Sequence, residues 1–339
     1  MTATATPPHP TPRGTEPLLS VRDLRVTFQR RGEEAFRAVD GVSFDVHPGQ
    51  TVGLVGESGC GKSVTSLAIM GLLPRRGVTV EGEASYEGTN LLGLGQEDMR
   101  DRRGRDIAMI FQDPLSSLNP VVPVGLQVTE VLERHRGMSR KAAQPVARDL
   151  LQRVGIPDPD RRLKDYPHQM SGGMRQRALI AMALACAPRL LIADEPTTAL
   201  DVTIQAQILA LLKELVVETG TALVMITHDL GVVAGLCDEV NVLYGGRIVE
   251  RGERHELFAD PRHPYTAGLL GSIPRLDAPR GEKLTPIPGS VADNLPWDSA
   301  CAFAPRCSQP IEVCTRTTPV LEESYRRALR CHNPVEVAR

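Results

Sequence analysis

Apolar and polar residues alternate in three stretches near the start of the chain, residues 18–26, 36–46 and 78–86. A period of two is typical of strands with one buried face. These stretches therefore predict a small antiparallel sheet. Residues 51–55 differ from them, because they form a short continuous apolar run, which is typical of a strand buried on both faces.

Short apolar runs recur through the rest of the chain and alternate with segments that have helical spacing. The runs predict strands, the last two as a hairpin, over residues 107–111, 190–193, 222–227, 240–244 and 247–251. The helical spacing predicts helices over residues 64–73, 124–154, 172–187 and 204–219. We therefore expect an α/β fold with a central parallel sheet, a small antiparallel sheet and a helical insert at about residues 113–168.

Composition separates the two ends of the chain from this core. Residues 1–17 are rich in Thr and Pro and lack the apolar segment of a secretory signal, so we expect a disordered tail. After Gly271 the chain becomes rich in Pro, Gly and Cys. The expected organisation is therefore a tail, a main domain over residues 18–270 and a C-terminal extension over residues 271–339.

Charge and hydropathy narrow the classes of partner. The 339-residue chain has a formal net charge of −2, which gives no overall attraction to nucleic acid or anionic lipid. No apolar run approaches the roughly 20 residues that span a bilayer. We therefore expect no nucleic-acid partner, and we expect any role at a membrane to run through another protein.

The clearest chemical motif lies between the buried strand 51–55 and the helix 64–73. It is Gly56-Glu57-Ser58-Gly59-Cys60-Gly61-Lys62-Ser63, which matches the phosphate-binding pattern G-x-x-x-x-G-K-[ST]. Its glycines allow backbone amides to approach an anion at a helix N-terminus. Lys62 is expected to reach the β- and γ-phosphates, and the Ser63 hydroxyl to bind Mg²⁺. Cys60 is expected to replace a serine and not to act as a redox switch.

Three further polar residues stand where predicted core strands end. Asp194 follows the apolar run 190–193, and its carboxylate is expected to face Mg²⁺. Glu195 comes next and could polarise a water for in-line attack on the γ-phosphate, so hydrolysis is the expected reaction. His228 follows strand 222–227, at the end where α/β folds place ligand-facing groups. His228 could hydrogen-bond the γ-phosphate and the attacking water. A lone histidine is more often structural, so this role depends on the residues around it.

Phe28 stands before a polar turn that leads back toward the same site. From the residues alone it suits two roles equally well. It could stack on a purine ring, or it could fill the core of the small sheet.

Together these motifs resemble the ATP-binding subunits of ABC transporters over residues 18–270. The resemblance rests on six motifs in the family's order: the phosphate loop, Gln112, Ser171-Gly172-Gly173-Met174-Arg175-Gln176, Asp194-Glu195, Ala199-Leu200-Asp201 and His228. It implies an ABC ATPase fold with a RecA-like sheet, in which two such domains pack head to tail around two ATP molecules.

The resemblance also implies roles for individual residues. Gln112 would contact Mg²⁺ and the attacking water, and would sense a membrane partner through the adjoining loop. Residues 171–174 would bind the γ-phosphate held by the other domain, at a helix N-terminus. Asp201 would lie at the dimer seam. Phe28 would stack on adenine, and His228 would hydrogen-bond the γ-phosphate.

One branch of this family, the di- and oligopeptide importers, is the best match. Met170 and Met174 depart from the commonest signature form, and both changes are familiar in this branch. Further similar stretches are residues 112–120, 263–266, 285–289 and 301–307. Nickel importers share much of the pattern, so the cargo remains open between peptides and a nickel complex.

Four cysteines gather near the C-terminus, Cys301, Cys307, Cys314 and Cys331, with five, six and sixteen residues between them. This spacing is not the paired C-x-x-C of a zinc ribbon. Thiolate softness suits either an Fe–S cluster or zinc, and four free thiols in a small core are the third possibility. The resemblance implies a [4Fe–4S] cluster, because members of this branch carry one on cysteines so placed.

The expected function is therefore ATP hydrolysis that powers the import of di- or oligopeptides across the cell membrane. The subunit is expected to be peripheral on the cytoplasmic face of that membrane. The implied partners are a second, related but different ATPase subunit, two integral membrane permeases and an extracytoplasmic peptide-binding protein. A soluble ABC ATPase is the alternative from another class, but such proteins usually carry two cassettes or a long coiled-coil insertion, whereas this chain shows one cassette and a modest insert. A P-loop kinase explains neither the Ser171 motif nor Glu195.

Overall fold

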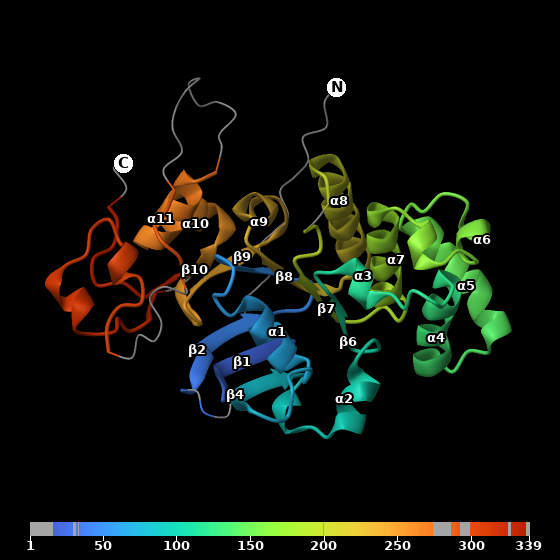
Figure 1. Cartoon of the computed structure of the whole chain (residues 1–339), viewed down its shortest axis with the longest axis horizontal. Helices are drawn as coiled ribbons and strands as arrows, with labels where there is room; N and C mark the ends of the chain where they lie inside the picture. Colours follow the sequence, from blue (N-terminus) through green and yellow to red (C-terminus); the bar gives the residue numbers. More distant parts are fainter. Residues whose placement is uncertain are drawn as a thin grey trace.

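The computed structural model contains two sheets, with helices around the larger one (Figure 1). It describes residues 16–29, 32, 34–198, 200–273, 286–291, 299–324 and 327–336. Most of the expected disordered tail, residues 1–15, lies outside these ranges, and so do Ala199 and Thr285. The expected α/β class, with a parallel core and a small antiparallel sheet, is confirmed.

The smaller sheet has the strand order β2-β1-β4-β5, and its neighbouring strands are antiparallel. Its strands are β1 (Leu19–Phe28), β2 (Phe36–Val46), β4 (Val78–Tyr86) and β5 (Thr89–Asn90). Figure 1 shows it beneath helix α1 (Lys62–Ile69). The apolar face that the alternation predicted packs in one cluster with residues of α1 and of the larger sheet.

The larger sheet has the order β11-β12-β10-β9-β3-β8-β7-β6. Strands β9, β3, β8, β7 and β6 are parallel, so their carboxyl ends lie along one edge. The bounds are β3 (Thr51–Val55), β6 (Ile107–Ile110), β7 (Leu190–Asp194), β8 (Ala222–Thr227), β9 (Glu239–Tyr244), β10 (Arg247–Glu253), β11 (Glu322–Ser324) and β12 (Arg327–Leu329). The predicted β9–β10 hairpin is confirmed.

Successive residues of the parallel strands face two separate hydrophobic cores. In β8, Val224 and Ile226 belong to the cluster shared with α1 and the small sheet. Leu223 and Met225 belong to the cluster beneath the helices on the opposite face. Because both faces are covered, these strands are apolar without alternation.

A group of helices lies beyond β6 at one end of the molecule (Figure 1). It contains α3 (Pro114–Ser117), α4 (Val124–Arg136), α5 (Arg140–Arg153), α6 (Pro159–Arg162) and α7 (Gly172–Leu184). The helical pattern expected over residues 124–154 is confirmed, and it is divided into two helices. Gly137 ends α4 in a left-handed conformation with φ 62°, and Ser139 caps α5 by accepting from the Ala142 amide.

The remaining helices cover the central sheet or join its strands. They are α2 (Gln96–Arg102), α8 (Val202–Thr219), α9 (Leu230–Leu236), α10 (Arg254–Ala259) and α11 (Pro264–Gly271), with 3₁₀ turns at Leu91–Gly93, Pro167–Gln169, Ala304–Arg306 and Glu312–Thr315. Helix α1 begins two residues before the expected start at 64. It ends at Ile69 because Gly71 takes φ 60°.

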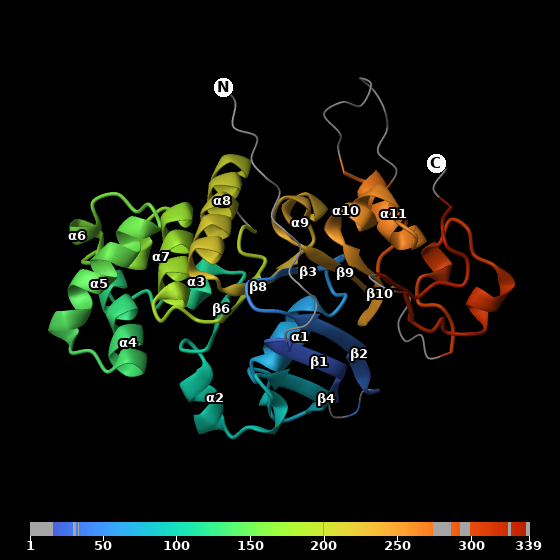
Figure 2. The same cartoon turned by 180° about the vertical axis from the view of Figure 1, so that it is seen from behind.

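The C-terminal extension adds two strands to the edge of the central sheet, which the sequence did not predict. Strand β12 pairs with β10 through Glu250 opposite Leu329 and Arg251 opposite Ala328. Figures 1 and 2 both place the extension at the end of the molecule opposite α4 to α6. In the part of the chain that the structure describes, no helix combines the length and the apolar character needed to cross a membrane.

Candidate functional site

The phosphate loop connects β3 to α1 and requires glycine at two of its bends. Gly56 has φ 154°, and a Cβ there would clash with the carbonyl oxygen of Leu243. Gly61 has φ 100° and precedes α1, and a Cβ there would lie 2.5 Å from the Ala38 carbonyl oxygen. The loop therefore packs against neighbouring backbone in a shape that only glycine allows.

Lys62 is buried at the start of α1. Its Nζ donates to the carbonyl oxygens of Gly56 at 2.7 Å and Glu57 at 2.9 Å, and lies 3.7 Å from the sulfur of Cys60. Burial raises the pKa of the Cys60 thiol. A buried neutral thiol is a poor nucleophile, which fits a serine-like packing role for Cys60 better than a redox role.

Ser63 and Asp194, the two residues expected to face Mg²⁺, are in direct contact. The Ser63 hydroxyl donates to Oδ1 of Asp194 at 2.9 Å. Burial raises the pKa of Asp194, the Ser63 hydroxyl opposes this rise, and the charge of Glu195 adds to it. A nearby divalent cation would favour the ionised form of Asp194. This donor set fits Mg²⁺, which commonly uses one or two carboxylates together with phosphate oxygens and water.

The three candidate catalytic residues come together at the carboxyl ends of adjacent strands. Glu195 follows β7, Gln112 lies just beyond β6, and His228 follows β8. Oε2 of Glu195 accepts from Nε2 of Gln112 at 3.0 Å, and Oε1 lies 3.2 Å from Nδ1 of His228. Residues separated by more than 100 positions in sequence thus form one polar cluster.

Glu195 is held in a defined position and charge state. Its backbone has φ 46°, an uncommon value for a residue with a side chain. Burial by itself would raise its pKa, but hydrogen bonds from Thr198 and His228 outweigh burial and hold the pKa below its usual value. Glu195 is therefore ionised at neutral pH and can accept a proton or a hydrogen bond from water.

The Ser171 motif lies apart from the phosphate loop of the same chain. Ser171 caps α7, and its hydroxyl accepts from the Met174 amide at 3.3 Å. Both views place α7 beside α4 and α5, displaced from α1 along the longest axis (Figures 1 and 2). Asp201 likewise caps α8 by accepting from the Ile204 amide. The amide-bearing end of α7 is therefore not part of this chain's own phosphate loop.

Phe28 ends β1 opposite Phe36 and packs, partly buried, against the core cluster of the small sheet. The packing agrees with one of its two suggested roles. Stacking on adenine stays a prediction. It is compatible with the packing, because part of the ring is exposed and available to a ligand.

Three residues that contact the site were missed from the sequence. The Thr198 hydroxyl donates to Oε2 of Glu195 at 2.8 Å. The Tyr265 hydroxyl accepts from the Glu57 amide at 2.8 Å, and Arg306 forms a bidentate ion pair with the Glu57 carboxylate. Thr198 had a local signal, its position three residues after Glu195. Tyr265 and Arg306 had none, because they lie over 200 positions from the loop.

The four cysteines of the extension lie near one another. The Cys301 amide donates to the Cys314 carbonyl at 2.8 Å. Burial raises the pKa of Cys331 to about 11, and the three other thiols add to this rise. Their side chains are nevertheless not arranged as ligands: over the described ranges, no three His, Cys, Asp or Glu side chains converge as a metal site.

Two family models match the chain. The model of the ABC transporter family matches residues 39–198, which include the phosphate loop, Gln112 and Glu195. A model described as the oligopeptide/dipeptide transporter C-terminal region matches residues 249–314, which include Tyr265 and Arg306.

Curated relatives match along most of the chain. The dipeptide transport ATP-binding protein DppD of Bacillus subtilis is 54% identical over 90% of each chain. The oligopeptide transport ATP-binding protein OppD of Salmonella typhimurium is 49% identical over 96% of each. Among solved structures, a dimeric ATP-binding cassette bound to ADP and phosphate superposes with a TM-score of 0.62 at 29% identity, covering 70% of this chain and 98% of that one. On this evidence, the chain belongs to the ABC transporter family.

Proposed function

We propose that this protein is the ATP-hydrolysing subunit of an importer for di- or oligopeptides. Hydrolysis is supported above all by the contacts of Glu195 with Gln112 and His228, beside the Ser63–Asp194 pair. The peptide cargo is supported by the match of the C-terminal region and by the names of the relatives.

The proposed mechanism assigns binding to the phosphate loop and proton handling to Glu195. Lys62 and the amides at the start of α1 bind the phosphates of ATP. Ser63, Asp194 and Gln112 would hold Mg²⁺, which would supply positive charge beside the phosphate oxygens. The ionised Glu195 accepts a hydrogen bond from the attacking water at one carboxylate oxygen, while His228 and Gln112 orient that carboxylate.

A second cassette completes the site in this proposal. Ser171 and the amides of residues 172–174 reach the γ-phosphate held by the partner cassette, because they do not lie at this chain's own loop. A dimeric cassette structure with the same fold supports such an arrangement. We further propose a related but different partner ATPase, two permeases and an extracytoplasmic peptide-binding protein, with this subunit peripheral on the cytoplasmic face of the membrane.

Replacing the catalytic carboxylate tests the proposal directly. Glu195→Gln is expected to keep ATP affinity but to lower kcat by about 10²- to 10⁴-fold, the range for loss of a positioned acid–base group. The amide can still contact its neighbours but cannot take a proton at neutral pH. Phosphate release and calorimetric ATP titration measure the two quantities.

The control is Glu97→Gln, because Glu97 is an exposed carboxylate of α2. It should leave both quantities unchanged. Near-normal turnover in Glu195→Gln would remove Glu195 from the catalytic role, and absence of ATP binding to the wild-type chain would end the proposal.

Reconstitution tests the cargo and the partners. The chain is co-expressed with its candidate permeases and second cassette, and the complex is placed in vesicles with the binding protein. Peptide-loaded binding protein should raise ATP hydrolysis and move labelled peptide across the membrane. Stimulation by a nickel complex in place of peptide would assign the other cargo, and failure to associate with any membrane subunit would favour a soluble ABC ATPase.

We also propose a [4Fe–4S] cluster on Cys301, Cys307, Cys314 and Cys331. The support is four thiols gathered in one small lobe, close enough for their charges to raise the pKa of Cys331. Positive charge from iron would favour the thiolate forms that burial disfavours.

Anaerobic purification tests the cluster. Broad visible absorbance with about four irons and four sulfides per chain would support it, and Cys331→Ser should lower both contents. Stoichiometric zinc in a colourless protein, or the absence of any metal, would overturn it. The control Cys186→Ser changes a cysteine outside the extension.

A further inference from the structure

The phosphate loop is attached to the C-terminal extension by one buried arginine. Arg306 ends the 3₁₀ turn Ala304–Arg306, and its side chain is 2% exposed. Its two terminal nitrogens donate to the two carboxylate oxygens of Glu57 at 2.6 and 2.9 Å. This bidentate geometry is the strongest that an arginine and a carboxylate form.

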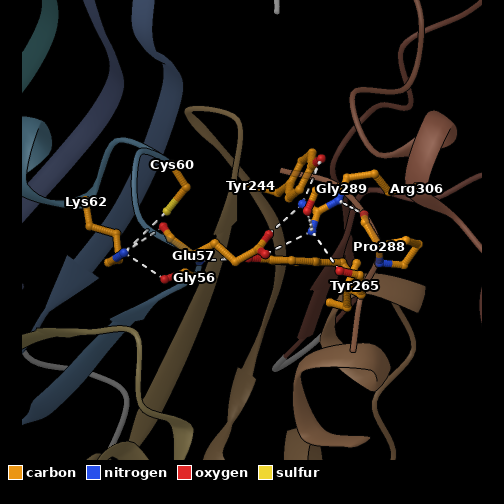
Figure 3. Close-up of polar contacts among 10 residues, drawn as sticks. Gly56, Glu57, Cys60, Lys62, Tyr244, Tyr265, Pro288, Gly289 and Arg306 are labelled. Atoms are coloured by element: carbon orange, nitrogen blue, oxygen red, sulfur yellow. Dashed lines mark hydrogen bonds and ion pairs between the residues drawn. The ribbon is translucent and has the colours of Figure 1, made fainter. Parts of the chain in front are cut away.

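Arg306 is itself held by several groups, so its position is well determined. It donates to the carbonyl oxygens of Pro288 at 2.7 Å and Gly289 at 3.1 Å, and its guanidinium carbon lies 5.7 Å from the ring centroid of Tyr244. Figure 3 shows the guanidinium among these groups, with its fork directed at Glu57. Because these contacts fix the guanidinium of Arg306, they also fix the Glu57 carboxylate that it binds.

The Glu57 segment is contacted from two sides. Figure 3 shows Lys62 on one side and Arg306 on the other. Lys62 bonds the Glu57 carbonyl, and the Tyr265 hydroxyl bonds the Glu57 amide. A lysine that turns to the β- and γ-phosphates gives up its carbonyl contacts. Tyr265 and Arg306 then remain as the anchors of this part of the loop.

Charge makes the arginine contact important for an anionic ligand. Glu57 places a carboxylate on the loop that would bind a triphosphate, and like charges repel. The guanidinium neutralises that carboxylate and directs it away from the Lys62 side of the loop. Without Arg306, a partly exposed negative charge would be free to lie beside the phosphates.

From these contacts we propose that Arg306 is a positioning residue for ATP binding, acting through Glu57 from within the C-terminal extension. This inference rests on the proposed ATPase function. It gives the extension a direct effect on the nucleotide site, through the ion pair between Arg306 and Glu57.

A double-mutant cycle on the full-length chain tests the inference. The dissociation constant for Mg²⁺-ATP is measured by calorimetry for wild type, Arg306→Ala, Glu57→Gln and the double variant. Arg306→Ala is expected to weaken binding about tenfold, a change of about 1.4 kcal/mol. Because removing Glu57's charge removes the repulsion, the double variant should bind within about threefold of Glu57→Gln alone.

Arg327→Ala is the matched control. Arg327 also ties the extension to the cassette, through Glu250 and Asp260 at 2.9 Å each, but it does not contact the loop. It should leave ATP affinity within about twofold of wild type.

Three results would overturn the inference: unchanged affinity in Arg306→Ala, losses that multiply in the double variant, or an equal loss in Arg327→Ala. Each presupposes that the wild-type chain binds ATP. Failure of wild-type binding would instead overturn the proposed function.

Discussion

The carboxyl edge of the central sheet and the C-terminal extension are organised in different ways. The edge gathers polar groups at strand ends, where Glu195 meets Gln112 and His228. The extension attaches through a buried aromatic group, in which Phe303 contacts Tyr244 and Tyr265 with ring centroids 5.1 and 5.3 Å apart. The carboxyl edge of the sheet thus presents polar groups that can act on a ligand, whereas the extension is attached by the packing of aromatic side chains.

The two regions nevertheless meet at the phosphate loop. Tyr265 of α11, whose ring packs against Phe303, and Arg306 of the extension both bond Glu57. The nucleotide site therefore depends on packing between residues that lie far in sequence from its motifs. Substitutions in each region can separate the contribution of packing from that of the catalytic groups.

The largest expected effect is on the packed region. Phe303→Ala removes a buried ring and should destabilise the docking of the extension by about 3–5 kcal/mol. Limited proteolysis and thermal melting of the full chain measure this. Val320→Ala, at an exposed position of the same extension, should change neither. An extension that stays protease-resistant without Phe303 would mean that packing is not what holds it.

The next effect is on the ligand-binding region. Lys62→Ala should weaken ATP binding about 100-fold, since it removes a charged hydrogen-bond donor worth about 3 kcal/mol to a phosphate. The extension should melt as in wild type. Lys213→Ala, which removes a lysine bonded to the Gly235 carbonyl, is the control and should bind ATP normally. Unchanged ATP affinity in Lys62→Ala would contradict the assigned contact.

Acid should weaken the packed region through His263. Burial lowers the pKa of His263 to about 3, so the folded chain keeps this ring neutral while the unfolded chain protonates it below about pH 6.5. The contribution of His263 to the free energy of unfolding is therefore fully present above about pH 6.5. It decreases by about 1.4 kcal/mol per pH unit as the pH falls toward 3.

Thermal melting at pH 7.5 and 5.5 measures this loss. His263→Asn keeps an oxygen that can accept from the Tyr265 amide, as Nδ1 of His263 does, but it cannot titrate. It should therefore show a smaller decrease in Tm between the two pH values than wild type. The control His255→Asn, at an exposed position, should show the wild-type decrease. Equal decreases in all three proteins would exclude His263 as the cause.

The smallest expected effect concerns the hydrogen bond between Thr198 and Glu195 at the carboxyl edge of the sheet. Thr198→Val removes the hydroxyl bonded to Glu195, which costs about 1 kcal/mol and lowers kcat about fivefold. Because that bond favours the ionised carboxylate, the pKa of Glu195 should rise and the acid limb of kcat should move to higher pH. Thr315→Val, on the extension, should leave the pH profile unchanged.

Much of the cassette was predictable because its signals are local. The continuous apolar run of β8 and the alternation of β1 each identified a strand from its own residues. Helix boundaries were less accurate where a glycine intervened, as at Gly137, because helical spacing does not show where φ turns positive. The extension's strands β11 and β12 were missed, since at three residues each they are too short to show a period.

The motifs of the nucleotide site could be read from the sequence alone: the phosphate loop, the carboxylates Asp194 and Glu195, and the family to which they point. Those residues are recognisable because each motif is contiguous and its local conformation depends on its own glycines and caps. The contacts of Arg306 and Tyr265 with Glu57 became visible only in the folded chain, because an ion pair across 249 positions depends on how the strands and the extension pack. No local pattern of residues records such a contact.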